Sequence, residues 1–106
     1  MKTETVIQRS ILDWLKAAGI LHMRVSLGGI RRGKGVRAKN PMTGYPDIQG
    51  LYGGRLFVVE VKTAKQNLSE EQESWRERLT KAGAIYILAR SVKDVQQELM
   101  AAWEAL

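Results

Sequence analysis

The chain of 106 residues contains no cysteine and one histidine, His22. The lack of cysteine excludes a disulfide scaffold, a thiolate metal site and a cysteine nucleophile. A zinc site built on several histidines is excluded as well. Any bound metal must therefore be held by carboxylate and carbonyl oxygens, which favours Mg²⁺ or Mn²⁺. A chain without cysteine also fits a reducing cytoplasm, the compartment that we expect.

Long apolar runs are absent too. No run approaches the roughly 18 residues that a membrane span needs, and the polar first residues, 1–4, are unlike a signal peptide. We therefore expect no membrane partner. Hydrophobic residues make up 44% of the chain and charged residues 26%, which excludes a wholly disordered protein. At this length we expect a single domain over residues 1–106.

Acidic residues are missing between Asp13 and Asp47, although the chain carries a net charge of +6. The basic residues of that stretch are Lys16, Arg24, Arg31, Arg32, Lys34, Arg37 and Lys39. Such asymmetry favours a polyanionic partner, most simply nucleic acid. Two alternatives are an acidic membrane surface, for which an amphipathic anchor helix is lacking, and a basic loop that serves only solubility.

The glycine-rich segment 28–44 predicts a long loop or an irregular hairpin. Residues 28–35 approach the phosphate-binding loop of nucleotide hydrolases. However, Gly35 stands where that loop needs a hydroxyl, and the segment leads to Asn40-Pro41 rather than into a helix. We therefore expect no nucleotide cofactor. The same glycines and arginines suit an arm that follows a phosphate backbone.

The hydrophobic periodicity predicts an α/β fold in the order α-β-β-β-α-β-α, with a mixed central sheet flanked by helices. Helices are expected over 4–18, from Ser69 to Gly83, and from Ser91 onward. Strands are expected over 21–26, 46–52, 55–62 and 84–89. In the second helix we expect a buried stripe, which consists of Trp75, Leu79 and Ala82.

Gly53-Gly54 between two apolar runs predicts a tight hairpin. A two-residue turn there places Asp47 directly opposite Glu60, with Cβ atoms about 4.5–5.5 Å apart. Two carboxylates at that range repel unless a cation or a proton lies between them. Lys62 projects on the same face as Glu60. The alternative is a surface salt-bridge cluster made of these three side chains.

Three motifs resemble those of the VRR-NUC family, the virus-type replication–repair nuclease domains of the PD-(D/E)XK superfamily. They are Gly44-Tyr45-Pro46-Asp47, then Glu60-Val61-Lys62 after a short apolar strand, then Leu68-Ser69-Glu70-Glu71-Gln72 leading to Trp75. The resemblance covers about residues 3–100. It implies a restriction-endonuclease-like core with a metal-dependent active site.

The resemblance also implies roles for individual residues. Asp47, Glu60 and the backbone carbonyl of Val61 would hold Mg²⁺ or Mn²⁺, and Lys62 would position or help to activate a water. Glu4 would stand near the metal, or would simply be a favourable charge at a helix N-terminus. Gln72 would reach the active site, or would serve only a capping box. The DNA-contacting set would be Ser26, Arg31, Arg32, Lys34, Arg37, Lys39 and Lys65, with Ser26 alternatively a plain surface serine.

The function implied is that of a metal-dependent endodeoxyribonuclease that resembles Holliday-junction resolvases. Its substrate would be branched or duplex DNA, it would act as a homodimer, and it would work in a bacterial or phage-infected cell. The first alternative is a non-catalytic DNA-binding module with the same fold. A restriction-type enzyme is a further alternative, although reading bases normally needs a longer chain.

Overall fold

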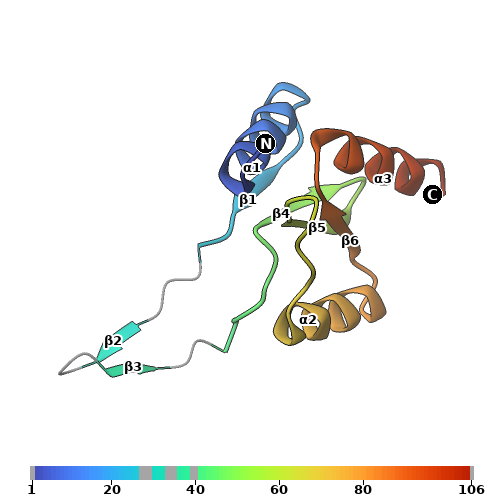
Figure 1. Cartoon of the computed structure of the whole chain (residues 1–106). Helices are drawn as coiled ribbons and strands as arrows, with labels where there is room; N and C mark the ends of the chain where they lie inside the picture. Colours follow the sequence, from blue (N-terminus) through green and yellow to red (C-terminus); the bar gives the residue numbers. More distant parts are fainter. Residues whose placement is uncertain (1, 27–29, 33–35, 39–40, 106) are drawn as a thin grey trace.

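The computed structural model describes residues 2–26, 30–32, 36–38 and 41–105. The elements, in chain order, are α1 (Glu4–Ala17), β1 (His22–Arg24), β2 (Ile30–Arg32), β3 (Val36–Ala38), β4 (Ile48–Tyr52), β5 (Arg55–Val61), α2 (Glu70–Lys81), β6 (Ile85–Ala89) and α3 (Val92–Glu104). The predicted order α-β-β-β-α-β-α is confirmed for the core, and the β2–β3 hairpin is inserted after the first strand (Figure 1).

The core of the fold is a mixed four-stranded sheet in the order β1-β4-β5-β6. β4 runs antiparallel to both β1 and β5, whereas β5 and β6 are parallel. The β5–α2–β6 segment is thus a parallel β-α-β unit, because two parallel neighbours need a crossover connection. The two central strands, β4 and β5, carry the residues of greatest interest for function.

The β4–β5 hairpin has the register that the sequence predicts. Ile48 pairs with Val59, and Tyr52 pairs with Arg55. Gly53 and Gly54 form the turn with φ of 60° and 78°. Two consecutive positive φ values are the requirement of the tight turn that matches strand twist, and glycine meets it without steric cost. One step beyond Ile48 and Val59, this register sets Asp47 opposite Glu60.

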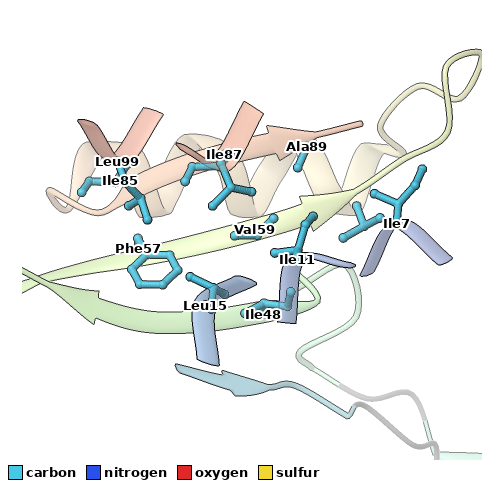
Figure 2. Close-up of a cluster of buried hydrophobic side chains, with 12 residues drawn as sticks. Ile7, Ile11, Leu15, Ile48, Phe57, Val59, Ile85, Ile87, Ala89 and Leu99 are labelled. Atoms are coloured by element: carbon cyan, nitrogen blue, oxygen red, sulfur yellow. The ribbon is translucent and has the colours of Figure 1, made fainter. Parts of the chain in front are cut away.

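Helices cover both faces of the sheet: α1 and α3 lie on one side and α2 on the other (Figure 1). The apolar core lies between the sheet and the α1/α3 layer (Figure 2). It consists of Ile7, Ile11, Leu15, Ile48, Phe57, Val59, Val61, Ile85, Ile87, Ala89, Val95 and Leu99. Alternate residues of β5 and β6 contribute to it, as the period of a strand requires.

The helix starts follow the capping residues in the sequence. Thr3, Ser69 and Ser91 each accept a hydrogen bond from the backbone N–H three residues on. Ser69 and Gln72 form the full, reciprocal capping box. These contacts satisfy N–H groups that have no partner within the helix. The ends of α1 and α2 at Ala17 and Lys81 lie within two residues of the expected positions.

The predicted buried stripe of α2 is wrong. This helix has no buried residue: Trp75 and Leu79 are half-buried, and Ala82 is exposed. The helix packs against the loop before β4 through Trp75, and against β6, where the Arg76 guanidinium carbon lies 5.6 Å from the centre of the Tyr86 ring. The Trp75 ring meets the Tyr45 ring edge-on at 5.0 Å, and its Nε1 donates to the Thr43 carbonyl at 3.1 Å. The apolar spacing was compatible with burial, but the surface opposite α2 leaves Trp75 and Leu79 partly exposed.

β2 and β3 pair antiparallel as a sheet of their own, with Arg31 opposite Arg37. This hairpin stands apart from the four-stranded sheet (Figure 1). Of the two forms expected for segment 28–44, the described residues adopt the hairpin. Lys34 and Lys39 lie outside the described residues.

None of the helices in the described part of the chain has the length and apolar character needed to span a bilayer.

Gly44 is where the loop before β4 meets α2. Its φ is +89°, and a Cβ placed there would lie 2.6 Å from the Glu71 backbone carbon. Real Cβ atoms do not approach backbone so closely, so the first turn of α2 and the loop fit together only because residue 44 has no side chain. The loop leads directly into Asp47, and its fit against α2 therefore fixes where β4 begins.

We expect Gly44→Ala to destabilise the fold more than Gly19→Ala. Gly19 also has a positive φ, +71°, but a Cβ there would meet nothing within 4 Å. Gly19→Ala should cost about 1–2 kcal/mol of unfolding free energy from its backbone alone. Gly44→Ala should cost about 1–3 kcal/mol more, because the Glu71 backbone must move. Urea unfolding of both variants measures the difference, and equal losses would contradict the close fit.

Candidate active site

Asp47 and Glu60 lie side by side at the end of the β4–β5 pair. Phe57, Val59 and Val61 of β5 point into the core, so Glu60 projects from the opposite face, on the α2 side. Its side chain is nevertheless only 2% exposed, and the Lys62 side chain is 9% exposed. A carboxyl and an ammonium group have thus been placed in a buried position at one end of an apolar strand. Burial of this kind costs free energy unless the groups are partnered or neutralised.

The Asp47 carboxylate is anchored by backbone. Its Oδ2 accepts a hydrogen bond from the Val61 N–H at 2.8 Å. The main chain of Asp47 is held as well, because its carbonyl accepts from the Val25 N–H at 2.8 Å and so continues the β1–β4 ladder. Both the position of Asp47 and the direction of its side chain are therefore determined by the sheet.

The pKa of Glu60 is raised from 4.5 to about 9, and burial is the largest cause of the rise. A hydrogen bond with Asp47, the negative charge of Asp47 and, to a smaller degree, the charge of Glu4 contribute to the same rise. Lys62 acts in the opposite direction and lowers the pKa of Glu60. At neutral pH without a cation, Glu60 therefore holds a proton and shares it in a hydrogen bond with Asp47. The repulsion expected from the sequence is relieved by that proton.

A surface salt-bridge cluster does not describe this arrangement. Glu60 is buried, and within residues 2–26 and 41–105 no ion pair joins Lys62 to Asp47 or Glu60 within 4.0 Å. Moreover, Glu60 Oε1 is inaccessible to solvent and accepts no hydrogen bond from an N–H or hydroxyl group of the described structure. A buried carboxyl oxygen without a partner is unusual and calls for a ligand that the chain itself does not supply.

A divalent cation fits these residues. The donors are hard carboxylate oxygens, which Mg²⁺ and Mn²⁺ prefer. One of them, Glu60 Oε1, has no other partner. A cation between the two carboxyls would replace the proton that Glu60 otherwise holds. Asp47 and Glu60, with the Val61 carbonyl beside them in the chain, are thus the residues that could hold the ion.

Glu4, expected near the metal, lies at the first turn of α1 and is exposed. Its negative charge is close enough to raise the pKa of Glu60. Its Oε2 accepts a hydrogen bond from Gln66 Nε2 at 3.0 Å. However, no group of three or more His, Cys, Asp or Glu side chains with metal-binding spacing occurs among the described residues. Glu4 therefore stands beside the carboxylate pair, and its direct ligation of a metal stays a prediction.

Gln72 is occupied by the capping box of α2. Its Oε1 accepts from the Ser69 N–H at 2.8 Å, and its own N–H donates to Ser69 Oγ at 3.2 Å. The structural alternative given for this residue is thus present, while a catalytic role for its amide nitrogen stays a prediction. Tyr45, one step before the Pro46-Asp47 pair, packs against Trp75 and donates to Gln49 Oε1 at 2.7 Å.

A solved structure described as a "VRR_NUC domain" is similar to this chain over almost its whole length. The match covers 89% of this chain and 90% of that chain, with a TM-score of 0.64 and 26% sequence identity. A scan against protein-family models and a search of curated proteins gave no match.

This chain has the VRR-NUC fold.

The VRR-NUC fold places the motif residues of the sequence in one corner of the molecule. Pro46-Asp47 leads into β4, Glu60-Val61-Lys62 ends β5, and the capping box with Trp75 begins α2. The resemblance found in the sequence and the similarity of the structures therefore point to the same nuclease superfamily. The DNA-contacting set is less well placed. Ser26 and Lys65 are exposed on the body of the domain, whereas Arg31, Arg32 and Arg37 belong to the separate β2–β3 hairpin.

Sequence reasoning missed one polar group on the sheet face of Glu60, the Tyr86 hydroxyl. Tyr86 lies on β6 and pairs with Val58, so it shares the sheet face of Glu60. Its hydroxyl is buried and has no hydrogen-bond partner in the described structure. Burial first, and then the charge of Glu60, raise the pKa of this phenol. The signal was available in principle: Tyr86 is the one polar side chain in strand 85–89, but only the β5–β6 register says which face it occupies.

We expect the unfolding free energy of the wild type in EDTA to fall as pH rises. The folded pKa of Glu60, about 9, lies above its unfolded value of 4.5. The folded state therefore binds the extra proton, and the stability from this group is complete below pH 4.5 and lost by pH 9. The limit for one proton is about 1.4 kcal/mol per pH unit.

Glu60→Gln should remove this slope, because glutamine keeps the shape of the protonated carboxyl and does not titrate. Glu73→Gln, at an exposed position of α2, is the matched control and should keep it. Urea unfolding between pH 5 and pH 9 measures all three proteins. If Glu60→Gln retained the wild-type slope, Glu60 would not carry the proton.

Proposed function

We propose that this chain is a metal-dependent endodeoxyribonuclease that cleaves branched DNA in the manner of Holliday-junction resolvases. The observation that carries the proposal is the buried pair Asp47 and Glu60, with Lys62 two residues on and an unpartnered Glu60 oxygen, in a VRR-NUC fold. A non-catalytic DNA-binding module has no use for two opposed carboxyls that weaken its own core.

In this proposal each residue has a separate task. Asp47, Glu60 and the Val61 carbonyl hold Mg²⁺ or Mn²⁺. Such an ion supplies Lewis-acid polarisation of a phosphodiester and a nucleophilic water at neutral pH. The backbone N–H of Lys62 donates a hydrogen bond to the Ala89 carbonyl at 3.0 Å, which holds the main chain of this residue in place. The Lys62 side chain orients that water and offsets the negative charge that develops on the phosphate. Asp47 is kept in position by the Val61 N–H throughout.

The proposed substrate is DNA with a branch, and the proposed active form is a homodimer. Apolar side chains on one side of the sheet support an interface: Leu21 is 70% exposed and Met23 is 57% exposed. They line a shallow pocket together with Leu51 and Leu56. A symmetric dimer would carry two active sites, one for each strand to be cut. The cytoplasmic location stays a prediction.

We expect Asp47→Asn to cleave a labelled four-way junction about 100-fold more slowly, or not at all, in Mg²⁺ or Mn²⁺. Removing a residue that hydrogen-bonds to a metal ligand typically costs about 10–100-fold in activity, and removing the ligand itself should cost at least as much. Flap and duplex substrates in the same assay rank the DNA preference. Thermal melts give a second reading: Mn²⁺ should raise the melting temperature of the wild type but not that of Asp47→Asn.

Asp13→Asn is the matched control, because Asp13 is exposed on α1 and lies outside the site. It should cleave and respond to Mn²⁺ like the wild type. A wild type that ignores Mn²⁺ and cuts none of the three substrates, but still binds DNA, would favour the non-catalytic module.

The β2–β3 hairpin should supply DNA affinity rather than chemistry. We expect the triple change of Arg31, Arg32 and Lys34 to Ala, made in the Asp47→Asn background, to weaken junction binding. The slope of log affinity against log salt should fall by about 0.9 for each phosphate that the hairpin no longer neutralises.

Fluorescence anisotropy between 50 and 200 mM salt, roughly the range over which phosphate contacts show their effect, measures the slope. Changing Arg9, Lys81 and Lys93 to Ala removes the same charge from exposed helical positions and is the control. If both triple variants lowered the slope equally, net charge and not the hairpin would bind the DNA.

A further inference from the structure

The segment between β5 and α2 begins directly after Lys62 and is tightly ordered by its own hydrogen bonds. The Gln66 N–H donates to the Thr63 carbonyl at 3.2 Å, which closes a turn. Gln66 Oε1 accepts from the Thr63 N–H at 2.8 Å. Both the main chain and the side chain of Gln66 are therefore tied to the residue that follows the lysine of the active site.

These contacts decide which way the Gln66 amide points. The Thr63 N–H can only donate, so the group that faces it must be the amide oxygen. The Gln66 NH₂ group is then left to face the other way, where it donates to Glu4 Oε2 at 3.0 Å. The backbone of the turn thus aims a donor at the carboxylate of Glu4, at the start of the helix α1 that packs against β5.

Arg90 fixes the same turn from the other side. Its Nη1 donates to the carbonyl of Thr63 and to the carbonyl of Gln66, the latter at 2.9 Å. Arg90 is itself anchored, because its N–H donates to Asp94 Oδ2 at 2.8 Å at the start of α3. Two carbonyls held by one planar guanidinium leave the turn little freedom to shift. The main chain of Gln66 therefore belongs to a turn that Arg90 holds in place.

We propose that Gln66 is a positioning residue that holds the Glu4 carboxylate beside the metal-binding pair Asp47 and Glu60. There Glu4 accepts hydrogen bonds from waters of a bound Mg²⁺ or Mn²⁺. Mg²⁺ in proteins usually takes one or two carboxylates and keeps several waters, so a third carboxylate beside the pair has such waters to bind. This inference rests on the proposed function, since it presupposes a divalent ion at Asp47 and Glu60.

The placement of Glu4 agrees with this role. Glu4 does not join Asp47 and Glu60 in a three-ligand group, yet α1 packs against β5, and Gln66 ties Glu4 to the turn that follows Lys62. A free glutamate at the first turn of a helix would sample several rotamers and would lose that freedom on binding. The Gln66 donor removes this cost in advance. Partners that hold the residues around a metal typically change metal affinity by about 10–100-fold when they are removed.

The test is a double-mutant cycle read by Mn²⁺ affinity, measured by calorimetry on the whole chain without DNA. Gln66→Met keeps the length of the side chain and its neutrality but removes both hydrogen bonds. We expect Gln66→Met to weaken Mn²⁺ binding about 10–100-fold, and Glu4→Gln to weaken it to a similar degree. If Gln66 acts through Glu4, the double variant should bind no more weakly than Glu4→Gln alone.

Gln97→Met, at an exposed position of α3, is the matched control and should bind Mn²⁺ like the wild type. Thermal melts in EDTA check that Gln66→Met remains folded. A merely structural tie would lower that melting temperature and leave Mn²⁺ affinity unchanged, which would overturn the inference. Independent, additive losses in the double variant would overturn it as well.

Failure of this inference and failure of the proposed function look different. If the wild type binds Mn²⁺ and Asp47→Asn does not, the metal site stands, and only the Gln66 variants decide the role of Gln66. If the wild type itself binds no Mn²⁺, the proposed function fails, and the role of Gln66 fails with it.

Discussion

The antiparallel pairing of β4 with β5 in a single register is the constraint on which the rest of the structure depends. The Gly53-Gly54 turn sets that register, and a shift by one residue would turn every side chain of one strand to the opposite face. In the register observed, Ile48, Phe57 and Val59 enter the core together. The same register brings Asp47 against Glu60 on the other face. Core and site are therefore two consequences of one strand pairing.

The site opposes the stability of the fold, and the core compensates for it. A carboxyl such as Glu60, buried to 2% exposure with an unpartnered oxygen, costs free energy in the absence of a ligand. The apolar layer between the sheet and the helices α1 and α3 is continuous and well buried. This layer holds the opposite face of β5 in place, so Asp47 and Glu60 keep their positions although their carboxyl groups are not fully hydrogen-bonded. Under the proposed function, a pair held in this way would bind a cation with little rearrangement.

The helix α2 has a different relation to the core. It buries no side chain, and it is held against the loop before β4 by Trp75, the carbonyl of Thr43 and the close fit at Gly44. The first helical turn of α2 thus touches the loop that leads into Asp47. The β-turn that precedes α2 contains Gln66 and is held by Arg90. The connection between β5 and α2 is for this reason a structural part of the site rather than a simple linker.

The sequence by itself determined those features that depend on local chemistry and strand period. Capping at Thr3, Ser69 and Ser91, the Gly53-Gly54 turn and the facing of Asp47 and Glu60 all follow from short-range rules, and the structure has them. The burial of α2 was not determined in this way: the spacing of Trp75 and Leu79 does not say how much surface lies opposite them.

Only the tertiary structure decided which distant residues surround the carboxylate pair. The donor from Gln66 to Glu4 joins residues that are far apart in the chain, and Arg90 reaches the Thr63 and Gln66 carbonyls from beyond β6. Tyr86 shares a face with Glu60 because β5 and β6 are parallel in one particular register. No local sequence pattern predicts these contacts, since they depend on how helices and strands pack once the core has formed. The facing of the two carboxyl groups can be predicted from the sequence, whereas the residues around them are determined by the packing.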